Sequence, residues 1–225
     1  MNPVLIFGAS GSLGMSILHH LRGDGIEVVG LSRNTKDADF LSLDDKKWFE
    51  KLSNHARPYS VVFAQGANVN DNVYAPSELR STLEANVVFV VENLSQLLNY
   101  GLVGKSSNVV ILSSIWQEIS RPNKMSYSVA KSALKGLVGS LVADLSKQGI
   151  RVNAVLPGVV DTPMTRSMLS NDVIARIKSE TPLGDLVGDM DVARTVAWLL
   201  SDLSTGVTGQ FIRVDNGWTN VKLYP

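Results

Sequence analysis

Val4-Leu-Ile-Phe-Gly8-Ala-Ser-Gly11-Ser-Leu-Gly14 decides the fold class of this chain, because it joins a short apolar run to a glycine-rich turn. The run predicts a buried strand, and the residues after the turn are amphipathic like a helix. Glycines permit a tight turn and close approach of a ligand, and the amino end of a helix offers free N–H groups to a pyrophosphate. Such turns also contain glycine for structural reasons alone, but this order of elements favours nucleotide binding.

Short apolar runs alternate with helix-length segments along the rest of the chain. Strands are predicted at Val4–Phe7, Val28–Leu31, Val61–Ala64, Val109–Leu112, Val152–Leu156 and Phe211–Val214, and helices at 13–22, 45–54, 76–99, 126–148 and 189–202. Several runs are apolar without alternation, as expected for strands that are covered on both faces of a parallel sheet. The pattern predicts an α/β fold over residues 1–225, a single-domain doubly wound Rossmann-type parallel sheet flanked by helices. The least regular part, 161–188, is the expected substrate lid.

The composition argues against a nucleic-acid-binding protein, a membrane-spanning protein and a metal site. Hydrophobic residues make up 44% of the 225 residues and charged residues 19%, which is typical of a globular domain. The 21 basic and 21 acidic residues cancel, which argues against a nucleic-acid partner. No apolar run has the length of a membrane span and the start shows no secretory signal, so we expect a soluble cytoplasmic protein. With no cysteine, and three histidines that lack ligand spacing, no metal site is expected.

Tyr127 and Lys131 are the main candidates for chemistry. In the predicted helix 126–148 they lie one turn apart on the same face. A phenol is a weak acid, with a reference pKa of roughly 10. A neighbouring ammonium favours the phenolate and so allows the hydroxyl to act as a general acid or base. The same spacing also occurs for packing alone, but here it follows Ser114 and a dinucleotide-type glycine loop.

With these motifs the chain resembles the classical short-chain dehydrogenase/reductase family over nearly its whole length. Asn86 in Leu83-Glu-Ala-Asn86-Val falls where the family has its catalytic asparagine, and Val110-Ile-Leu-Ser113-Ser114 resembles the strand that ends in the catalytic serine. Pro157-Gly158-Val-Val-Asp-Thr162 resembles the segment beside the nicotinamide. Thr181-Pro-Leu-Gly and Val207-Thr-Gly-Gln-Phe-Ile-Arg-Val-Asp-Asn-Gly217 resemble the closing elements of the classical group.

The resemblance implies an oxidoreductase that interconverts a carbonyl and a secondary alcohol on a small organic substrate. Tyr127 would transfer the proton, and Lys131 would lower the pKa of the tyrosine and hold the nicotinamide ribose. Ser114 would hydrogen-bond to the substrate oxygen, and Asn86 would hold a water that connects Lys131 to solvent. Taken singly, these residues also fit a capping serine, a core-edge tyrosine, a snorkelling lysine and a helix-terminal asparagine.

The cofactor site is also implied by the resemblance. Its expected residues are Gly8, Ser10, Gly11, Ser12, Leu13, Gly14, Ser32, Arg33, Asn34, Leu43, Ala64, Gly66, Tyr127, Lys131, Pro157, Gly158, Val160 and Thr162. NAD-specific relatives place an acidic residue at the end of the second strand, where this chain has Ser32 followed by Arg33. A guanidinium can hold a 2′-phosphate, so we expect NADP(H), with NAD(H) as the alternative.

The chain departs from the family pattern at several points. Its glycine spacing, Gly-x-x-Gly-x-x-Gly, is that of extended sugar-modifying members, and Ser12 replaces a classical glycine. The usual Asn-Asn-Ala-Gly stretch reads Phe63-Ala-Gln-Gly66, and Ser42 stands where an adenine-binding aspartate is common. The interval from Arg33 to Leu43 is short, which predicts an abbreviated peripheral helix. Nucleotide-sugar modification and a non-catalytic dinucleotide-binding regulatory role therefore remain alternatives.

Two further expectations concern the substrate and the assembly. Trp116, Gln117 and Met125 fall on a segment that lines substrate pockets in the family, although simple packing explains them equally well. Segments 76–99 and 126–148 carry more apolar positions than one sheet face requires. Leu134, Leu137, Val138, Leu141, Val142 and Leu145 spread over a broad arc of the second segment. We therefore expect a homotetramer, or a homodimer, that pairs these helices.

Overall fold

The computed structural model describes residues 1–33, 40–45, 47–52 and 58–221. Within them one parallel sheet has the strand order β3-β2-β1-β4-β5-β6-β7. The strands are β1 (Val4–Phe7), β2 (Val28–Ser32), β3 (Phe40–Ser42), β4 (Ser60–Phe63), β5 (Asn108–Leu112), β6 (Arg151–Pro157) and β7 (Phe211–Val214). From the central strand β1, the chain adds β2 and β3 on one side of the sheet. It then returns to the other side of β1 and adds β4, β5, β6 and β7 in order. The sheet is therefore doubly wound, as predicted.

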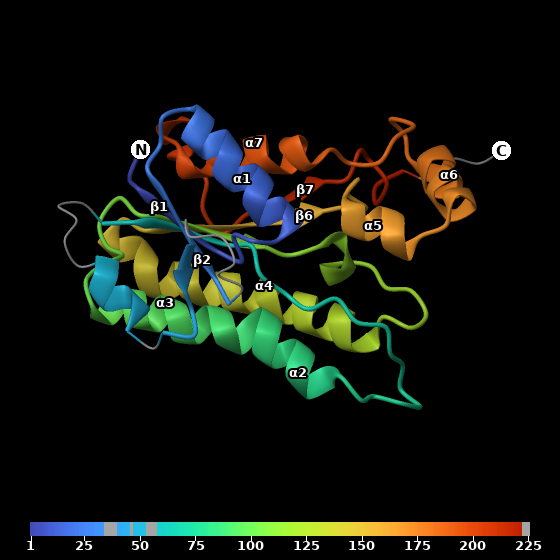
Figure 1. Ribbon diagram of the computed structural model, residues 1–225, viewed down its shortest axis with the longest axis horizontal. Helices are drawn as coiled ribbons and strands as arrows, with labels where there is room; N and C mark the ends of the chain where they lie inside the picture. The colour runs from blue at the N-terminus through green and yellow to red at the C-terminus, as the bar shows by residue number, and fades with distance from the viewer. Residues whose placement is uncertain (34–39, 46, 53–57, 222–225) are drawn as a thin grey trace.

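Helices cover both faces of the sheet (Figure 1). α1 (Ser12–Gly23) and α7 (Asp189–Leu200) lie over one face, and α2 (Leu79–Leu83), α3 (Phe89–Asn99) and α4 (Met125–Leu145) lie over the other. α5 (Pro163–Met168) and α6 (Asn171–Glu180) stand apart at one end of the molecule. A π turn, η2 (Glu84–Val88), joins α2 to α3, and short 3-10 turns occur at η1 (Trp48–Leu52), η3 (Ile115–Gln117), η4 (Ser146–Gln148) and η5 (Asp202–Ser204). None of the helices in the described ranges is long and apolar enough to cross a membrane.

The buried strands explain the uninterrupted apolar runs in the sequence. Val61 and Phe63 of β4 belong to the core between the sheet and α3–α4, whereas Val62 belongs to the core under α1 and α7. Because successive side chains of a strand point to opposite faces, a strand covered on both sides is apolar at every position. The rings of Phe7 and Phe63 stack at a centroid distance of 4.8 Å, which ties the two central strands together.

The structure corrects three expectations about local elements. The helix expected at 45–54 is, in its described part, only the 3-10 turn Trp48–Leu52, and the helix expected at 76–99 is interrupted by the π turn. The lid region 161–188, expected to be irregular, contains α5 and α6. Thr162 and Ser170 cap these two helices by accepting hydrogen bonds from Thr165 N and Val173 N. The expected abbreviated helix concerns 34–39, which lie outside the described residues.

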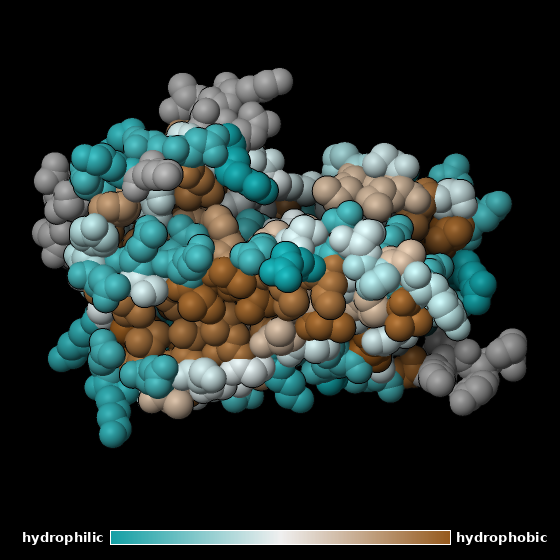
Figure 2. Space-filling model, turned by 90° about the horizontal axis from the view of Figure 1, so that it is seen from below, coloured by the Kyte–Doolittle hydropathy of each residue, from teal (hydrophilic) through white to brown (hydrophobic). Residues whose placement is uncertain are grey.

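One face of the molecule is broadly apolar. Seen from the side of α2, α3 and α4, a large hydrophobic patch is open to solvent (Figure 2). On these helices Val91 and Val129 are 44% and 45% exposed, and Leu137 and Leu141 are half-buried. Leu134, Val138 and Leu145 of the same helix are buried within the subunit. The broad apolar arc of α4 therefore divides into an inner half and an outer half.

Candidate active site

The glycine loop lies at the point where the strand order reverses, between β1 and β4. Gly8 has a φ of +77°, and a Cβ on it would lie 2.6 Å from the backbone nitrogen of Gln65. A Cβ on Gly14 would lie 2.2 Å from the carbonyl oxygen of Gly8. Gly11 caps α1 without a side-chain hydrogen bond, so Ser12 and Leu13 begin a helix with no side-chain cap at its amino end. This close-packed backbone with a helix terminus is the arrangement that receives a pyrophosphate.

The end of β2 meets the glycine loop. The hydroxyls of Ser10 and Ser32 are hydrogen-bonded at 2.6 Å, and Leu43 N donates to Ser32 O at 3.0 Å. Ser32 is buried, whereas Arg33 is exposed at the rim. The structure therefore brings Ser10, Ser32, Arg33 and Leu43 together as expected. Asn34, also expected at the cofactor, lies outside the described residues.

The residues after β4 lie between the glycine loop and the expected catalytic residues. Ala64 N donates to Phe7 O at 2.9 Å. A Cβ on Gly66 would lie 2.6 Å from Asn86 Oδ1 and 3.4 Å from Lys131 Nζ, so only glycine fits here. Both amide atoms of Gln65, and Asn86 Oδ1, are buried without a hydrogen-bond partner among the described residues. Unsatisfied buried polar groups beside a glycine-lined cradle fit a bound dinucleotide, which would supply the missing partners.

The expected catalytic residues come from three elements. Asn86 lies in the π turn, and its Nδ2 donates to Thr82 O at 2.9 Å and to Ala67 O at 3.1 Å. π turns inside helices are frequent at functional sites, and this one holds the asparagine against the end of β4. Ser114 is the second residue after β5, and its hydroxyl accepts a hydrogen bond from Trp116 N at 3.3 Å.

Tyr127 and Lys131 lie at the start of α4. Lys131 Nζ is 5.7 Å from the centre of the Tyr127 ring and donates to Leu112 O at the end of β5, at 3.0 Å. Lys131 is 4% exposed. The structure therefore places the serine, the tyrosine, the lysine and the asparagine at the carboxyl ends of β4 and β5, where ligands of such sheets bind.

The electrostatics of this group differ from the expectation. Burial raises the pKa of Tyr127, while a hydrogen bond with the Ser114 side chain acts in the opposite direction. Burial also lowers the pKa of Lys131 to about 8. The expected net lowering of the tyrosine pKa by Lys131 is therefore wrong for the protein without a ligand, because removal of the phenolate from water outweighs its neighbours.

The segment after β6 continues the site toward the lid. Pro157 ends β6, and Gly158 N donates to Val214 O at 2.9 Å. A Cβ on Gly158 would lie 3.0 Å from Asp215 Cα, so the two chain segments approach closely. Val160 forms an isolated bridge with Val187, and Thr162 caps α5. These residues connect the sheet directly to α5, in the region expected to be the lid.

The three expected substrate residues have different surroundings. Trp116 is half-buried and packs edge-to-face on Trp218, with a ring-centre distance of 6.1 Å. Met125 begins α4. Gln117 is buried, and its Oε1 accepts a hydrogen bond from Ser113 at 2.8 Å. Gln117 therefore holds the end of β5 in place.

Sequence reasoning missed a second lysine at the tyrosine. Lys124 Nζ is 5.3 Å from the centre of the Tyr127 ring and donates to Asn68 Oδ1 and, at 3.0 Å, to Val69 O. Burial, together with the nearby guanidinium of Arg121, lowers its pKa to about 8 against the opposing effect of Asp71. The spacing Lys124-x-x-Tyr127, which places both on one helix face, was the available signal. In the described ranges no group of His, Cys, Asp or Glu side chains is suited to hold a metal ion.

Comparison with known proteins identifies the family. A family model described as enoyl-(acyl carrier protein) reductase matches residues 46–219. The chain belongs to the short-chain dehydrogenase/reductase family. It is therefore an oxidoreductase of the kind that interconverts carbonyl and alcohol groups.

Individual members of the family resemble the chain over nearly all of its length. It is 27% identical to the 3-oxoacyl-[acyl-carrier-protein] reductase FabG of Escherichia coli, with 95% of each protein covered. It is 29% identical to the uncharacterized oxidoreductase YmfI of Bacillus subtilis, over 95% of this chain and 97% of that protein. The solved 3-oxoacyl-[acyl-carrier protein] reductase of Brucella melitensis superposes with a TM-score of 0.84 at 25% identity, over 98% of this chain and 92% of that one. The solved Brucella melitensis protein therefore shares the fold of this chain over nearly its whole length.

Proposed function

We propose that this protein is an NADP(H)-dependent oxidoreductase that interconverts a carbonyl and a secondary alcohol on a small organic substrate, with Tyr127 as the acid/base. The observation that carries the proposal is the position of Tyr127. Its ring lies beside Lys131, close to Ser114, at the carboxyl ends of the central strands. A proton donor at this edge of the sheet stands next to the cradle formed by Gly8, Gly14 and Gly66.

The chemistry assigned to each side chain follows from its surroundings. In the reductive direction the phenol of Tyr127 donates its proton to the carbonyl oxygen, and in oxidation it accepts the proton of the alcohol. Ser114 donates a hydrogen bond to the same oxygen and stabilises the charge that develops on it. NADP(H), when bound, supplies or accepts the hydride. Lys131 holds the ribose hydroxyls of the cofactor and brings a positive charge close to the phenol.

Asn86 provides a route for the proton that Tyr127 loses. Its Oδ1 is buried without a partner among the described residues and lies, like Lys131 Nζ, directly beside Gly66. A carbonyl oxygen in this position accepts a hydrogen bond from a water molecule between Asn86 and Lys131. The tyrosine proton is then replaced through Lys131 and this water.

Preference for NADP(H) over NAD(H) is supported by the end of β2. The position that would carry an acidic residue in an NAD-specific protein is Ser32, which is buried and bonded to Ser10. Arg33 is exposed next to it, within the described part of the rim. A guanidinium forms paired hydrogen bonds with a phosphate, whereas no carboxylate is present at Ser32 to repel it.

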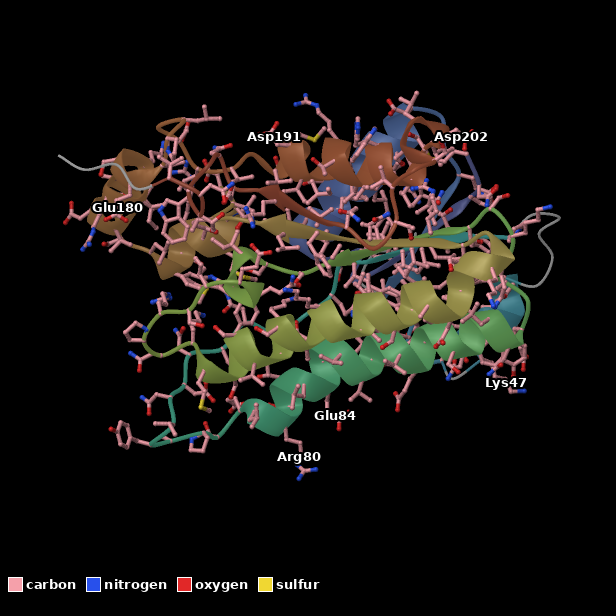
Figure 3. All side chains as sticks on the ribbon, turned by 180° about the vertical axis from the view of Figure 1, so that it is seen from behind. Lys47, Arg80, Glu84, Glu180, Asp191 and Asp202 are labelled. Carbon is pink, nitrogen blue, oxygen red and sulfur yellow. The ribbon has the colours of Figure 1, made fainter. Side chains whose placement is uncertain are left out.

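A homo-oligomer is the proposed assembly, with a tetramer expected and a dimer as the alternative. The apolar patch over α3 and α4 is too large for single scattered side chains, and such patches mark interaction surfaces. Charged side chains stand at its edge: Arg80 and Glu84 point outward from α2 and the π turn (Figure 3). An apolar centre with a charged rim is the usual anatomy of a subunit interface.

The deciding experiment is a turnover assay. The protein is incubated with NADPH, or separately NADH, and a panel of ketones, oxoacyl thioesters and keto-sugars, while cofactor absorbance is followed. Consumption of NADPH with at least one carbonyl supports the proposal. Tight binding of NADPH without turnover of any panel member would instead support a dinucleotide-binding regulatory protein.

A further inference from the structure

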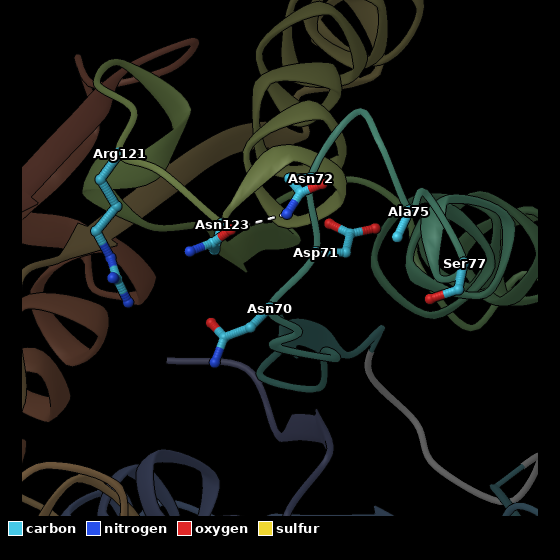
Figure 4. Close-up of a pocket in the computed structure, with 7 residues that line it drawn as sticks. All are labelled: Asn70, Asp71, Asn72, Ala75, Ser77, Arg121 and Asn123. Carbon is cyan, nitrogen blue, oxygen red and sulfur yellow. Dashed lines mark hydrogen bonds between the residues drawn. The ribbon is translucent and has the colours of Figure 1, made fainter.

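A polar cleft opens just before the start of α4 (Figure 4). Its volume is about 390 Å³, and its hydrogen-bonding lining consists of Asn70, Asp71, Asn72, Ser77, Arg121 and Asn123. The guanidinium of Arg121 and the side-chain amides of Asn70 and Asn123 face the same opening in this view. Asn123 Oδ1 accepts a hydrogen bond from Asn72 Nδ2 at 3.0 Å, which leaves the amide nitrogen of Asn123 as a donor.

The acidic groups near the cleft are already engaged. The carboxylate of Asp71 accepts hydrogen bonds from Ser126 N at 2.9 Å and from the Ser126 hydroxyl, and these bonds lower its pKa. Glu118, three residues before Arg121, is instead paired with Arg213 at 2.6 Å. No acidic partner of Arg121 occurs in the described part of the chain, and its guanidinium lies over the ring of Trp116 at 5.6 Å.

A second positive charge lies behind the cleft. Lys124 is 4% exposed, and the groups that accept its hydrogen bonds, Asn68 Oδ1 and Val69 O, are both neutral. Uncompensated buried charge is unfavourable unless something of opposite sign completes the site. The carboxylate of Asp71, which also lines the opening, compensates part of the charge of Lys124, and Arg121 adds a further positive charge beside the side-chain amides of Asn70 and Asn123.

The cleft is placed for contact with the substrate. Ser126, which donates to Asp71, directly precedes Tyr127, and the ring of Tyr127 lies 5.3 Å from Lys124 Nζ. Ser126 and Lys124 thus connect the start of α4, which carries Tyr127, to the lining of the cleft.

We propose that this cleft binds an anionic group of the substrate, a carboxylate or a phosphate, with Arg121 as the specificity-determining residue. The proposal rests on the proposed function, since it names the substrate class of the same site. Arg121 contributes the charge-assisted hydrogen bonds, and Asn70 and Asn123 contribute neutral ones.

The first test compares matched substrates with NADPH at pH 7 and constant ionic strength. Acetoacetate is compared with its methyl ester, and dihydroxyacetone phosphate with dihydroxyacetone. We expect kcat/KM to favour one anionic member by about tenfold to a hundredfold, the range of a charge-assisted contact. A preference for acetoacetate alone indicates a carboxylate as the bound group, and a preference for dihydroxyacetone phosphate alone indicates a phosphate. Equal or better use of both neutral members would overturn the proposal.

Variants show whether Arg121 is responsible. Arg121→Ala should remove the preference mainly by raising KM for the anionic member, and Arg121→Lys should keep part of it. Arg194→Ala is the matched control, because it removes an exposed arginine from α7 over the other face of the sheet. If Arg121→Ala changes kcat/KM for the anionic and the neutral member of a pair by the same factor, Arg121 does not distinguish the two substrates by charge. The proposal then fails.

A binding measurement separates this proposal from the proposed function. Should the wild type turn over neither pair, calorimetry with succinate and with inorganic phosphate tests the cleft directly. Binding by the wild type and by Arg194→Ala, with at least a tenfold loss in Arg121→Ala, would retain the anion site although the redox proposal had failed. Absence of binding by the wild type, or unchanged binding by Arg121→Ala, would overturn the anion site itself.

Discussion

Lys131 Nζ lies 5.7 Å from the centre of the Tyr127 ring and at the same time donates to the last carbonyl of β5. This double contact ties the helix that carries the tyrosine to the strand that precedes Ser114. The ammonium is thereby held close to the phenol by the sheet itself. The relationship links the fold to the proposed chemistry, because a shift of α4 along β5 would move Tyr127 and Lys131 together away from Ser114.

Tyr127→Phe removes the transferable proton and keeps the ring. We expect single-turnover reduction to slow by a factor of roughly 100 to 10,000, as for loss of a general acid, while NADPH binding changes little. Stopped-flow absorbance measures the first quantity and fluorescence titration of NADPH the second. Tyr100→Phe, which removes a hydroxyl from an exposed tyrosine that stacks on Phe49, is the control and should keep wild-type rates. Wild-type turnover in Tyr127→Phe would refute the acid/base role.

Arg33→Asp replaces the expected phosphate partner with a repelling charge. The affinity for NADPH should fall about tenfold to a hundredfold relative to that for NADH, which corresponds to roughly 1.5–3 kcal/mol for a charge-assisted contact. Dissociation constants of both cofactors, measured with wild type and variant, give the ratio. An unchanged ratio would mean that Arg33 is a surface residue without a role in cofactor choice.

Gly14→Ala tests the packing of the cofactor loop. Its Cβ would lie 2.2 Å from Gly8 O, so the loop or α1 must move. We expect a loss of roughly 2 kcal/mol or more in the free energy of unfolding, together with loss of NADPH binding. Gly23→Ala, at the end of the same helix with nothing within 4 Å of its Cβ, should be neutral or stabilise by about 0.5 kcal/mol. Urea denaturation measures the free energy of unfolding of the two variants, and titration measures their affinity for NADPH. Equal stability and equal NADPH affinity in both variants would contradict the steric argument.

Lys131→Met should make the protein more stable at neutral pH. Burial lowers the pKa of Lys131 from 10.5 to about 8, so the folded state binds its proton less strongly than the unfolded state does. The cost of the buried charge is therefore complete below pH 8, about 3 kcal/mol at 1.36 kcal/mol per pKa unit, and disappears as the pH rises to 10.5. Loss of the bond to Leu112 O offsets about 1 kcal/mol, so we expect a net gain of roughly 2 kcal/mol at pH 7.

The pH dependence of this gain is the specific signature. Between pH 7 and pH 9.5 the stability difference between Lys131→Met and wild type should shrink by about 2 kcal/mol, as measured by urea denaturation. Lys135→Met, which removes an exposed lysine from the same helix, is the control and should change stability by less than about 0.5 kcal/mol. A difference that is constant across this range would show that the Lys131 ammonium is not buried at a cost.

The sequence predicted the sheet well because its strands are buried on both faces. Val4–Phe7 and Phe211–Val214 agree with the structure residue for residue: the first is buried at every position, and the second keeps three apolar residues around the exposed Arg213. The short strand Phe40–Ser42 was missed, because three residues at a sheet edge carry no periodic signal. α5 and α6 were missed for a related reason: they are short, and their caps at Thr162 and Ser170 were the only local indications.

The expected catalytic group was assembled from residues that the structure brings together, because the family pattern fixes their spacing. Its electrostatics were not predictable in the same way. The pKa of Tyr127 depends on how deeply the ring is buried, and that depth is set by elements far away in the sequence. Asn86 illustrates the same limit, since the π turn that holds it packs against α4 and leaves no trace in the helical periodicity of 76–99.

The last prediction concerns the apolar face of α3 and α4. Leu134, Val138 and Leu145 are buried within the subunit, but Leu137, Leu141 and Val142 remain partly open although they belong to the same apolar arc. Val91 of α3 and Val129 of α4 are 44% and 45% exposed, and on this side of the isolated chain a large apolar patch is open to water (Figure 2). Such a face is most readily covered by the same face of a second copy, related by a two-fold axis. Light scattering should therefore give a mass of a dimer or tetramer of the 24.3 kDa chain.

Charge placed in this patch should separate the subunits. Val91→Lys and Val129→Lys each bring an ammonium into the apolar centre, where both copies of a two-fold interface would carry it. We expect the mass at micromolar concentration to fall toward that of the monomer. Val173→Lys is the matched control, because Val173 is 42% exposed on α6, away from the patch, and its variant should keep the wild-type mass. A wild type that scatters as a monomer, or variants that remain assembled, would show that this face is not the contact between copies.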